Sequence, residues 1–422
     1  HVTLVIYTRG ARIVDTVVRL ESQTKQILSL ITGLLIMLCT GILYMWSVFL
    51  PYVVKEFGWA TGDVGMTSSI MMAAFVLGNI VSGCVQSKVP ARIISCVGCV
   101  LFATGMFLTS RLNGGAPWMI YLTYGVVSGI GCGMAYNTVI AVLQKWFVSR
   151  KGLITGLAVG TFGAATVVMS PIVNNLLDKS GVSNTFMILS FVFLIVGGGA
   201  SLFLSQPQME HYMIDTAASN SGSGAKQYTP GEMVRTSMFY LLILSLFAST
   251  APYMLIVPYI KTIAADRGVS EAMALATVMI TGIANASGRI ICPALSDKFR
   301  MSRIVIGYSI VASLSCILMI FARGPMYMVT VFLIVFTYGG GSGLNPVMST
   351  ELFGAKNAGV NYGIVLIGLA VSSVTMGKVA SAVGTSTEGF NAVFVICAIV
   401  ALIPIAAILL LRKICKKCGK IF

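Results

Sequence analysis

Arg289 is the one charged residue that lies deep inside a long apolar stretch of the chain. All 13 acidic residues fall in polar segments or near the ends of apolar stretches, so no carboxylate lies at the depth of Arg289. If that stretch spans a membrane, an arginine at its centre costs about 2.5–3.5 kcal/mol even on insertion-derived scales. We expect an anion bound in a cavity to compensate this charge, because a guanidinium makes paired hydrogen bonds to a carboxylate.

Asn285 lies four residues before Arg289 and therefore on the same face of a helix. Its amide can hydrogen-bond the ligand that Arg289 binds. Two other interpretations stay open. Arg289 can extend toward the membrane surface or pair with Asp297, about 12 Å further along a helix that rises about 1.5 Å per residue. Asn285 can instead bond to a neighbouring helix.

Four tyrosines fall near the middle of predicted membrane helices. A phenol combines an apolar ring with one hydrogen-bond donor, which suits the wall of a site for a small carboxylate, although each ring also suits simple packing. A further cation, Lys378, lies near the end of its apolar stretch, which favours an interfacial lysine over a site residue. The four tyrosines are Tyr44, Tyr136, Tyr253 and Tyr338.

The composition determines the class of protein. Hydrophobic residues make up 57% of the 422 positions and charged residues only 10%, whereas about a quarter of the residues in a soluble domain are charged. Apolar stretches of roughly 20 residues, the length that crosses a bilayer, recur along the whole chain. The sequence therefore predicts an all-α integral membrane protein whose surroundings are the lipid bilayer.

We expect twelve transmembrane helices separated by short polar segments. The net charge of +15 does not indicate nucleic-acid binding, because the Lys and Arg residues lie between the predicted helices and not on one polar face. The predicted helices cover residues 27–54, 62–86, 91–110, 116–146, 151–178, 184–204, 234–265, 270–296, 301–322, 325–352, 356–383 and 388–411.

The basic residues also predict the orientation in the membrane. Eleven Lys and Arg residues lie in the loops on one predicted side and six on the other, and five more follow residue 411. Cytoplasmic loops carry the excess of positive charge, so both termini are predicted to be cytoplasmic. The tail contains Cys415 and Cys418 without the second pair of ligands that a zinc site needs, and we expect it to contact anionic lipid.

A polar segment rich in serine and glycine divides the predicted helices six and six. We expect residues 205–233 to form a flexible cytoplasmic linker between helical halves at 27–204 and 234–411. Residues 1–26 are predicted as an N-terminal cytoplasmic segment and residues 412–422 as a basic cytoplasmic tail.

The two predicted halves repeat each other in sequence. A Thr-Tyr-Gly-x-x-Ser-Gly motif begins at Thr123 in the fourth predicted helix and recurs with the same spacing at Thr337 in the tenth. A Gly-Leu-Ala-Val motif at Gly156 recurs at Gly368. These matches indicate the duplication of a six-helix unit.

Two six-helix repeats joined by a cytoplasmic linker resemble the major facilitator superfamily, whose members bind substrate near the membrane midplane between the halves. The segment from Asp297 and Lys298 to Arg303 resembles the signature cytoplasmic loop of that superfamily, which implies a role in gating. The first-half copy of this loop has Ser87 where Asp is usual, so one gating salt bridge is expected to be missing.

Several stretches carry a closer resemblance. They are Gly33-Leu34-Leu35-Ile36-Met37-Leu38-Cys39, Tyr44-x-Trp46-Ser47-Val48-Phe49, Phe57-Gly58-Trp59, Asn285-x-x-Gly288-Arg289 and Lys356-Asn357-Ala358-Gly359-x-Asn361-Tyr362-Gly363. They are similar to the oxalate/formate antiporter family, a branch related to the monocarboxylate transporters. This resemblance implies that Arg289 binds the substrate carboxylate and that Tyr44, Tyr136 and Tyr338 enclose it.

The chain differs from that family at two positions expected to line the substrate site. Phe162 stands where the family has a tyrosine, and Leu369 stands where oxalate exchangers have a second cation, a lysine. A dianion beside a single arginine would leave a buried charge uncompensated. We therefore expect a monocarboxylate in preference to oxalate, with lactate, pyruvate, acetate and formate all open.

The predicted function is secondary active or facilitative transport of a small carboxylate by alternating access. Exchange and proton symport both stay open, because no embedded carboxylate or histidine offers a proton relay. The alternatives are an oxalate/formate-type exchanger, a carrier of a neutral or cationic metabolite, and a nutrient sensor. No nucleotide-binding or catalytic motif occurs, so neither an enzyme nor a cofactor is expected. The resemblance implies a plasma-membrane location.

Overall fold

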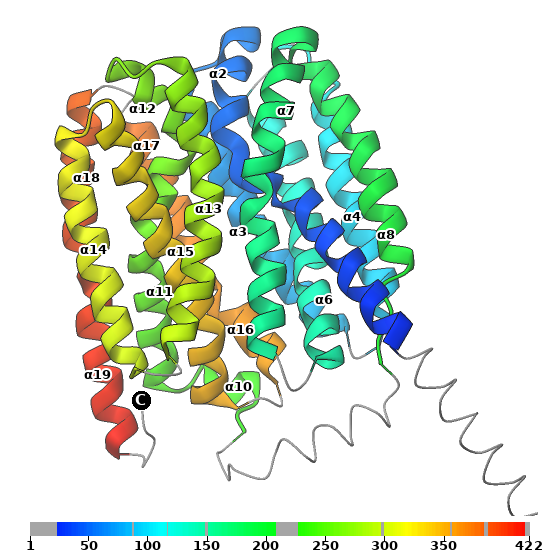
Figure 1. Ribbon diagram of the computed structural model, residues 1–422, viewed down its shortest axis with the longest axis vertical. Coiled ribbons are helices and arrows are strands. Elements are labelled where there is room, and N and C mark those ends of the chain that lie inside the picture. Colours follow the sequence, from blue (N-terminus) through cyan, green and yellow to red (C-terminus); the bar gives the residue numbers. More distant parts are fainter. Residues whose placement is uncertain are drawn as a thin grey trace, which may run out of the picture.

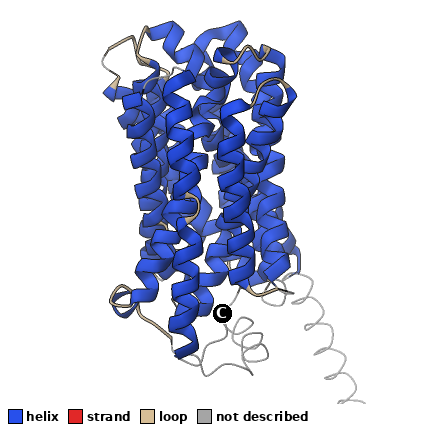
Figure 2. Ribbon diagram, turned by 90° about the vertical axis from the view of Figure 1, so that its left-hand side faces the viewer, coloured by secondary structure: helices blue, strands red, loops and turns tan. Residues whose placement is uncertain are grey.

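The computed structural model describes residues 23–86, 88–115, 117–147, 151–207, 227–296, 299–354, 357–383 and 387–417. Within these ranges the chain forms helices and short connections, and no strand occurs (Figures 1 and 2). The long helices lie side by side along the long axis of the molecule (Figure 1). The all-α prediction is therefore confirmed for the described part of the chain.

The N-terminal group of membrane-spanning helices begins at Gln23, where the first span (Gln23–Phe57) starts as a helix that continues into η1 and α2. The later elements of this group include two π-helical segments, η2 and η4. The elements are η1 (Gly41–Met45), α2 (Trp46–Phe57), α3 (Thr61–Val85), α4 (Ala91–Thr109), α5 (Trp118–Ile120), η2 (Tyr121–Ser128), α6 (Gly129–Trp146), α7 (Lys151–Phe193), η4 (Leu194–Gly198) and α8 (Gly199–Leu202).

The C-terminal group begins with a short helix, α10. It ends with α18 and α19, which are separated by a turn at Ala401 and Leu402. The elements are α10 (Pro230–Met233), α11 (Ser237–Ile256), η5 (Val257–Tyr259), α12 (Ile260–Asp266), α13 (Glu271–Ser296), α14 (Met301–Phe321), α15 (Pro325–Phe353), α16 (Ala358–Val365), α17 (Ile367–Val383), α18 (Thr387–Val400) and α19 (Ile403–Lys417).

Eleven helical segments among the described residues are long and apolar enough to cross a membrane. One of them, Leu153–Leu202, has 50 residues, whereas roughly 20 residues suffice for one crossing. Gly181 interrupts it with φ of 72° and ψ of 178°, a conformation that glycine adopts readily because it lacks a Cβ. This segment therefore accommodates the predicted spans at 151–178 and 184–204, and the eleven segments accommodate twelve crossings.

Local sequence signals explain several helix ends. The Thr229 hydroxyl accepts a hydrogen bond from the Glu232 backbone at 3.3 Å, and the Glu232 carboxylate accepts one from the Thr229 backbone at 2.8 Å, which forms a capping box at α10. Thr236 caps α11 in a similar way through the backbone N–H of Phe239 at 3.3 Å. Gly58, with φ of 69°, ends α2.

Glycines bring α13 and α15 into direct backbone contact. A Cβ atom at Gly288 of α13 would lie 2.2 Å from the carbonyl oxygen of Phe336, and one at Gly339 of α15 would lie 2.4 Å from that of Asn285. Any larger side chain would therefore force the helices apart. This contact fixes the helix that carries Asn285 and Arg289, because small residues let two membrane helices approach closely.

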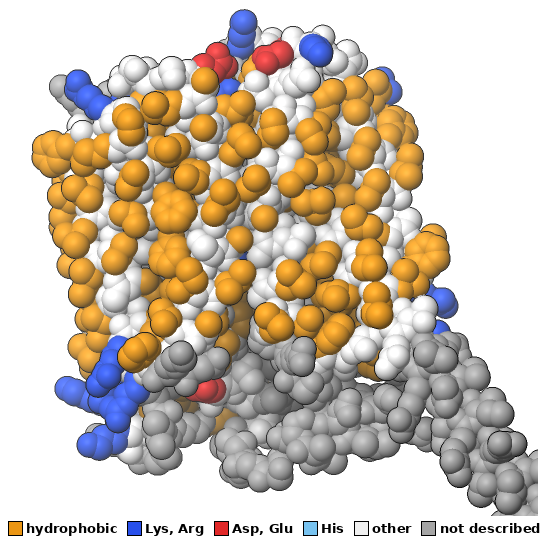
Figure 3. All heavy atoms as spheres, viewed as in Figure 1, with side chains coloured by type: hydrophobic (Ala, Val, Ile, Leu, Met, Phe, Trp, Pro, Cys, Tyr) orange, Lys and Arg blue, Asp and Glu red, His pale blue; other side chains and the backbone are white. Residues whose placement is uncertain are grey.

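The N-terminal and C-terminal groups contact each other mainly through two pairs of helices, because α13 packs against α7 and α17 packs against α3. The outward faces of the helices carry large apolar side chains such as Leu153, Ile195 and Phe321. Figure 3 shows apolar side chains across the lateral face, with acidic and basic side chains near its two ends. This distribution is the one that a bilayer requires.

Some helix boundaries in the structure differ from the predicted ones, and other predicted boundaries fall on residues outside the described ranges. The first helix already includes Gln23, ahead of the predicted start at residue 27, and α19 continues to Lys417, so part of the predicted basic tail is helical. Lys and Arg are good helix formers and can extend a helix beyond the apolar layer. Residues 1–22, 208–226 and 418–422 lie outside the described residues. The linker, the division into halves and the orientation of the termini therefore stay predictions.

Candidate functional site

Arg289 of α13 is buried, with 4% of its surface exposed. Its Nε donates a hydrogen bond to Oδ1 of Asn285 at 2.8 Å, and its Nη2 donates to the hydroxyl of Tyr44 at 2.9 Å. Its Nη1 donates to the hydroxyl of Tyr136 at 3.5 Å. Three segments distant in sequence, η1, α6 and α13, therefore meet at one guanidinium group.

This geometry bears on two of the interpretations of Asn285 and Arg289. Asn285 lies one helical turn before Arg289, as predicted, and holds its guanidinium instead of bonding to another helix. Arg289 points toward Tyr44 and Tyr136 and does not extend to the membrane surface. Asp297, the other proposed partner, lies outside the described residues.

An aromatic wall surrounds the guanidinium. The carbon Cζ of Arg289 lies 5.9 Å from the ring centres of both Tyr44 and Tyr338, within the range of cation–π attraction. The hydroxyls of these two tyrosines lie 3.2 Å apart. Tyr253 stacks on Tyr338 with ring centres 3.6 Å apart and an angle of 9°. The four central tyrosines noted in the sequence thus lie in one cluster, which the phenols of Tyr44, Tyr136 and Tyr338 and the ring of Tyr253 form around Arg289.

Phe162 of α7 completes the wall, with its ring centre 5.2 Å from that of Tyr44 and 4.9 Å from that of Tyr136. Leu369 is buried near the start of α17. Four residues later and on the same helix face, Ser373 lines a small pocket next to Tyr44. Neither Phe162 nor Leu369 supplies a charge.

No carboxylate pairs with Arg289 in the described part of the chain, where its partners are an amide and two phenols. A guanidinium has five N–H donors, and the three hydrogen bonds leave two of them for a further acceptor. The phenols of Tyr44 and Tyr136, which accept from Arg289 here, can rotate their hydroxyl hydrogens and donate to an anion. This arrangement can therefore hold a carboxylate between a guanidinium and several phenols.

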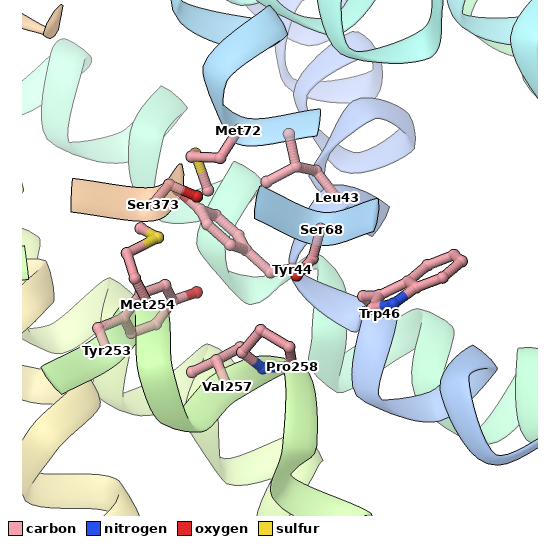
Figure 4. A pocket seen from close by; sticks show the side chains of 10 residues that line it. All are labelled: Leu43, Tyr44, Trp46, Ser68, Met72, Tyr253, Met254, Val257, Pro258 and Ser373. Carbon is pink, nitrogen blue, oxygen red and sulfur yellow. The ribbon is translucent and has the colours of Figure 1, made fainter. Parts of the chain in front are cut away.

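A pocket of about 20 Å³ lies beside Tyr44 and Tyr253, enough for roughly one water-sized group. It is lined from both helix groups, by η1, α2 and α3 on one side and by α11, η5 and α17 on the other. Figure 4 shows Met72, Met254 and Ser373 gathered on one side of this pocket and the Trp46 ring at the opposite side.

A second polar cluster escaped the sequence analysis. Lys261, near the end of the predicted helix 234–265, is buried in α12. Its ammonium group donates to Oδ1 of Asn174 at 3.1 Å and lies 3.7 Å from the Glu271 carboxylate. The Tyr52 hydroxyl donates to the carboxylate of Asp178, and the Asn174 amide donates to the same carboxylate at 3.1 Å. We call these five residues the interhelix polar cluster. A sequence alone gives no signal that pairs residues so far apart.

Other predicted functional residues lie away from the Arg289 cluster. Arg303 is exposed near the start of α14, while Asp297 and Lys298 of the predicted gating loop lie outside the described residues. Lys378 is exposed on α17, as expected for an interfacial lysine.

The asparagines of the Asn357–Gly363 stretch hold the segment before α10. The side-chain amides of Asn357 and Asn361 both donate to the carbonyl oxygen of Tyr228, at 3.0 and 3.2 Å. The backbone N–H of Tyr228 in turn donates to the carbonyl oxygen of Phe353 at 2.9 Å. These two asparagines therefore have a structural role at the junction of α15 and α16.

Comparison with known proteins agrees with this architecture. The sequence model described as Major Facilitator Superfamily matches residues 32–377, most of the chain. The chain belongs to the Major Facilitator Superfamily. The superfamily is one of transporters, and it is the superfamily that the sequence resemblance predicted.

Similar members of the superfamily include proteins from bacteria and animals. The uncharacterized MFS-type transporter YhjX of Escherichia coli (strain K12) is 25% identical over 358 residues, 83% of this chain and 87% of that protein. The oxalate:formate antiporter of Oxalobacter formigenes is 24% identical over 387 residues, 88% of each chain. Human monocarboxylate transporter 12 is 24% identical over 381 residues, 83% of this chain and 72% of that protein.

Proposed function

We propose that this superfamily member carries small monocarboxylates across the membrane by alternating access, with Arg289 as the group that binds the carboxylate. The observation that supports this proposal is a buried guanidinium whose partners in the described part of the chain are uncharged and which keeps two N–H donors for a further acceptor. A charge at this depth requires compensation, and a carboxylate supplies both the charge and the planar pair of oxygens.

The remaining site residues have matching roles in this proposal. Asn285 orients the guanidinium through its 2.8 Å hydrogen bond, and Tyr44, Tyr136 and Tyr338 enclose the carboxylate. The two helix groups, residues 27–204 and 234–411, move relative to each other around this site, and Asp297, Lys298 and Arg303 act in gating. Both termini are cytoplasmic in the plasma membrane.

A monocarboxylate fits the charge of this cluster better than oxalate. Phe162 and Leu369 are buried and apolar, so Arg289 is the cation that the described part of the cluster offers. A dianion would leave one negative charge without a partner in a low-dielectric site. Coupling by exchange or by proton symport fits the same geometry.

Oxalate/formate exchange is the second candidate function. The observation that favours it is the similarity to the oxalate:formate antiporter of Oxalobacter formigenes, which covers 88% of each chain. It would require a second cation to approach the site, or a monoanionic form of the substrate.

Uptake of labelled lactate, acetate and formate into proteoliposomes tests the proposal. We expect at least one of them to enter, and we expect the other monocarboxylates to compete more strongly than oxalate or uncharged analogues. Protein-free liposomes give the background. Competition by oxalate alone would favour the exchanger, and competition by uncharged or cationic solutes without any effect of carboxylates would contradict both.

A further inference from the structure

The small pocket beside the Arg289 cluster shares two residues with it. Tyr44 bonds to Arg289 through its hydroxyl and presents its ring to the pocket, and Tyr253 stacks on Tyr338 and also lines the pocket (Figure 4). A ligand whose carboxylate lies at Arg289 therefore has this pocket as the adjoining space within the protein.

The lining of the pocket is suited to an apolar group. The hydroxyl of Ser68 already donates to the carbonyl oxygen of Gly65 at 2.9 Å, and that of Ser373 donates to the carbonyl oxygen of Ser69 at 3.2 Å. Their hydrogens are thus directed at the backbone. Much of the remaining lining is apolar, and it includes the thioether side chains of Met72 from α3 and Met254 from α11.

We propose that this pocket receives the end of the substrate opposite the carboxylate, and that Met72 and Met254 set the longest chain that fits. This inference rests on the proposed function. A volume of about 20 Å³ has room for one small group, about the size of a methyl group. Methionine is flexible and adapts to small changes in shape, so a short substrate fits by a small movement, whereas each further methylene has to displace a side chain from one of the two helix groups.

The variants Met72→Ala and Met254→Ala test this inference. The measurement is uptake of the labelled monocarboxylate that the wild type transports best, with unlabelled formate, acetate, propionate or butyrate added as a competitor. We expect the apparent affinity for propionate and butyrate to rise relative to acetate, by about fourfold per methylene that the enlarged pocket accommodates. Met326→Ala, at an exposed methionine of α15, is the matched control and should keep the wild-type order.

A substitution that enlarges the side chain keeps the inference testable if the alanine variants fail to fold. Met254→Phe fills the pocket and should weaken acetate relative to formate. An unchanged chain-length order in Met72→Ala, Met254→Ala and Met254→Phe, with uptake of the smallest substrate intact, would overturn the role of the pocket and leave the proposed function standing. If no carboxylate competes with uptake by the wild type, it is the proposed function that fails.

The interhelix polar cluster supports a second, independent inference. Tyr52, Asn174 and Asp178 belong to α2 and α7 of the N-terminal group, and Lys261 and Glu271 belong to α12 and α13 of the C-terminal group. Figure 1 shows α2 and α12 toward the end of the bundle opposite α10. The buried ammonium of Lys261 joins the two groups there through Asn174, and it lies 5.2 Å from the ring centre of Tyr52.

We infer that this cluster is a latch that holds the two helix groups together at that end. Separating them exposes the path to the pocket and breaks the contacts between Lys261 and Asn174 and between Lys261 and Tyr52. Glu271 stays with Lys261 on the same helix group, so the ammonium keeps one partner after separation. The latch can therefore open without leaving an isolated charge.

Labelling of a cysteine in the pocket tests the latch. Ser373→Cys places a thiol at a buried position. A maleimide that does not cross the membrane is added on the side that carries the cluster. The same protein without Ser373→Cys gives the background labelling. Lys261→Met should raise the labelling rate by about tenfold, because it removes a charge-assisted hydrogen bond between the groups. Lys55→Met, at an exposed lysine of α2, should not change it.

A milder variant, Asn174→Ala, deletes the amide oxygen that accepts the hydrogen bond of Lys261 across the two groups and leaves Glu271 as the partner of Lys261. It should raise the labelling rate by a smaller factor than Lys261→Met. A rate in both variants equal to that of Lys55→Met would overturn the latch.

Discussion

Replacement of Arg289 by lysine should reduce the initial rate of monocarboxylate uptake by about ten- to a hundredfold. The guanidinium bonds to Asn285, Tyr44 and Tyr136 from three different nitrogens, and a lysine ammonium cannot reproduce this planar arrangement while it also pairs with both oxygens of a carboxylate. Loss of one such hydrogen bond costs about 1.5–3 kcal/mol, and each 1.4 kcal/mol corresponds to about a tenfold change.

The measurement is uptake into proteoliposomes that contain equal amounts of folded protein. Arg92→Lys, at an exposed arginine of α4, is the matched control and should transport like the wild type. Because Arg289→Lys keeps the positive charge, a defect in this variant reports on geometry and not on charge alone. Near-normal uptake by Arg289→Lys would remove the main support for the proposed site.

Replacement of Gly288 by valine should abolish most of the correctly folded protein. Its Cβ would lie 2.2 Å from the carbonyl oxygen of Phe336 and 2.8 Å from the backbone nitrogen of Gly340, so α13 and α15 would have to separate. Overpacking of a tight contact costs about 1–3 kcal/mol and sometimes more, and here the obstacle is backbone, which cannot change rotamer.

Thermal unfolding and the yield of monodisperse protein in detergent measure this effect. Gly307→Val is the matched control, because a Cβ at Gly307 of α14 meets no other atom within 4 Å. It introduces the same β-branched residue into a helix, so any cost of helix propensity is common to both variants. Equal stability of the two variants would contradict the direct contact between α13 and α15.

The sequence was sufficient for the class of fold and for much of the neighbourhood of Arg289. Apolar stretches of membrane-spanning length identify the helices, and the spacing of four residues places Asn285 on the face of Arg289. The depth of Arg289 in its helix also follows from the sequence. These features depend on residues close together in the sequence, so the spacing of those residues is enough to predict them.

Periodicity alone did not predict the contacts between distant helices, although the family resemblance placed Tyr44 and Tyr338 in one site with Arg289. The hydroxyl of Tyr44 meets a guanidinium 245 residues away, and that of Tyr338 lies 3.2 Å from the hydroxyl of Tyr44. Periodicity gives the depth of each tyrosine but not the direction in which it faces. Lys261 shows the same limit, because the sequence places it near a helix end but does not pair it with Asn174, which lies 87 residues earlier.

The glycine contact between α13 and α15 determines which site residues move together. No layer of side chains separates the two backbones at Gly288 and Gly339, so no rotamer change can absorb a displacement of one helix relative to the other. Arg289 and Tyr338 consequently share one rigid frame, whereas Tyr44 is attached to another. The boundary between the two frames runs through the hydroxyls of Tyr44 and Tyr136, two oxygen atoms of the N-terminal group that accept hydrogen bonds from Arg289 across it.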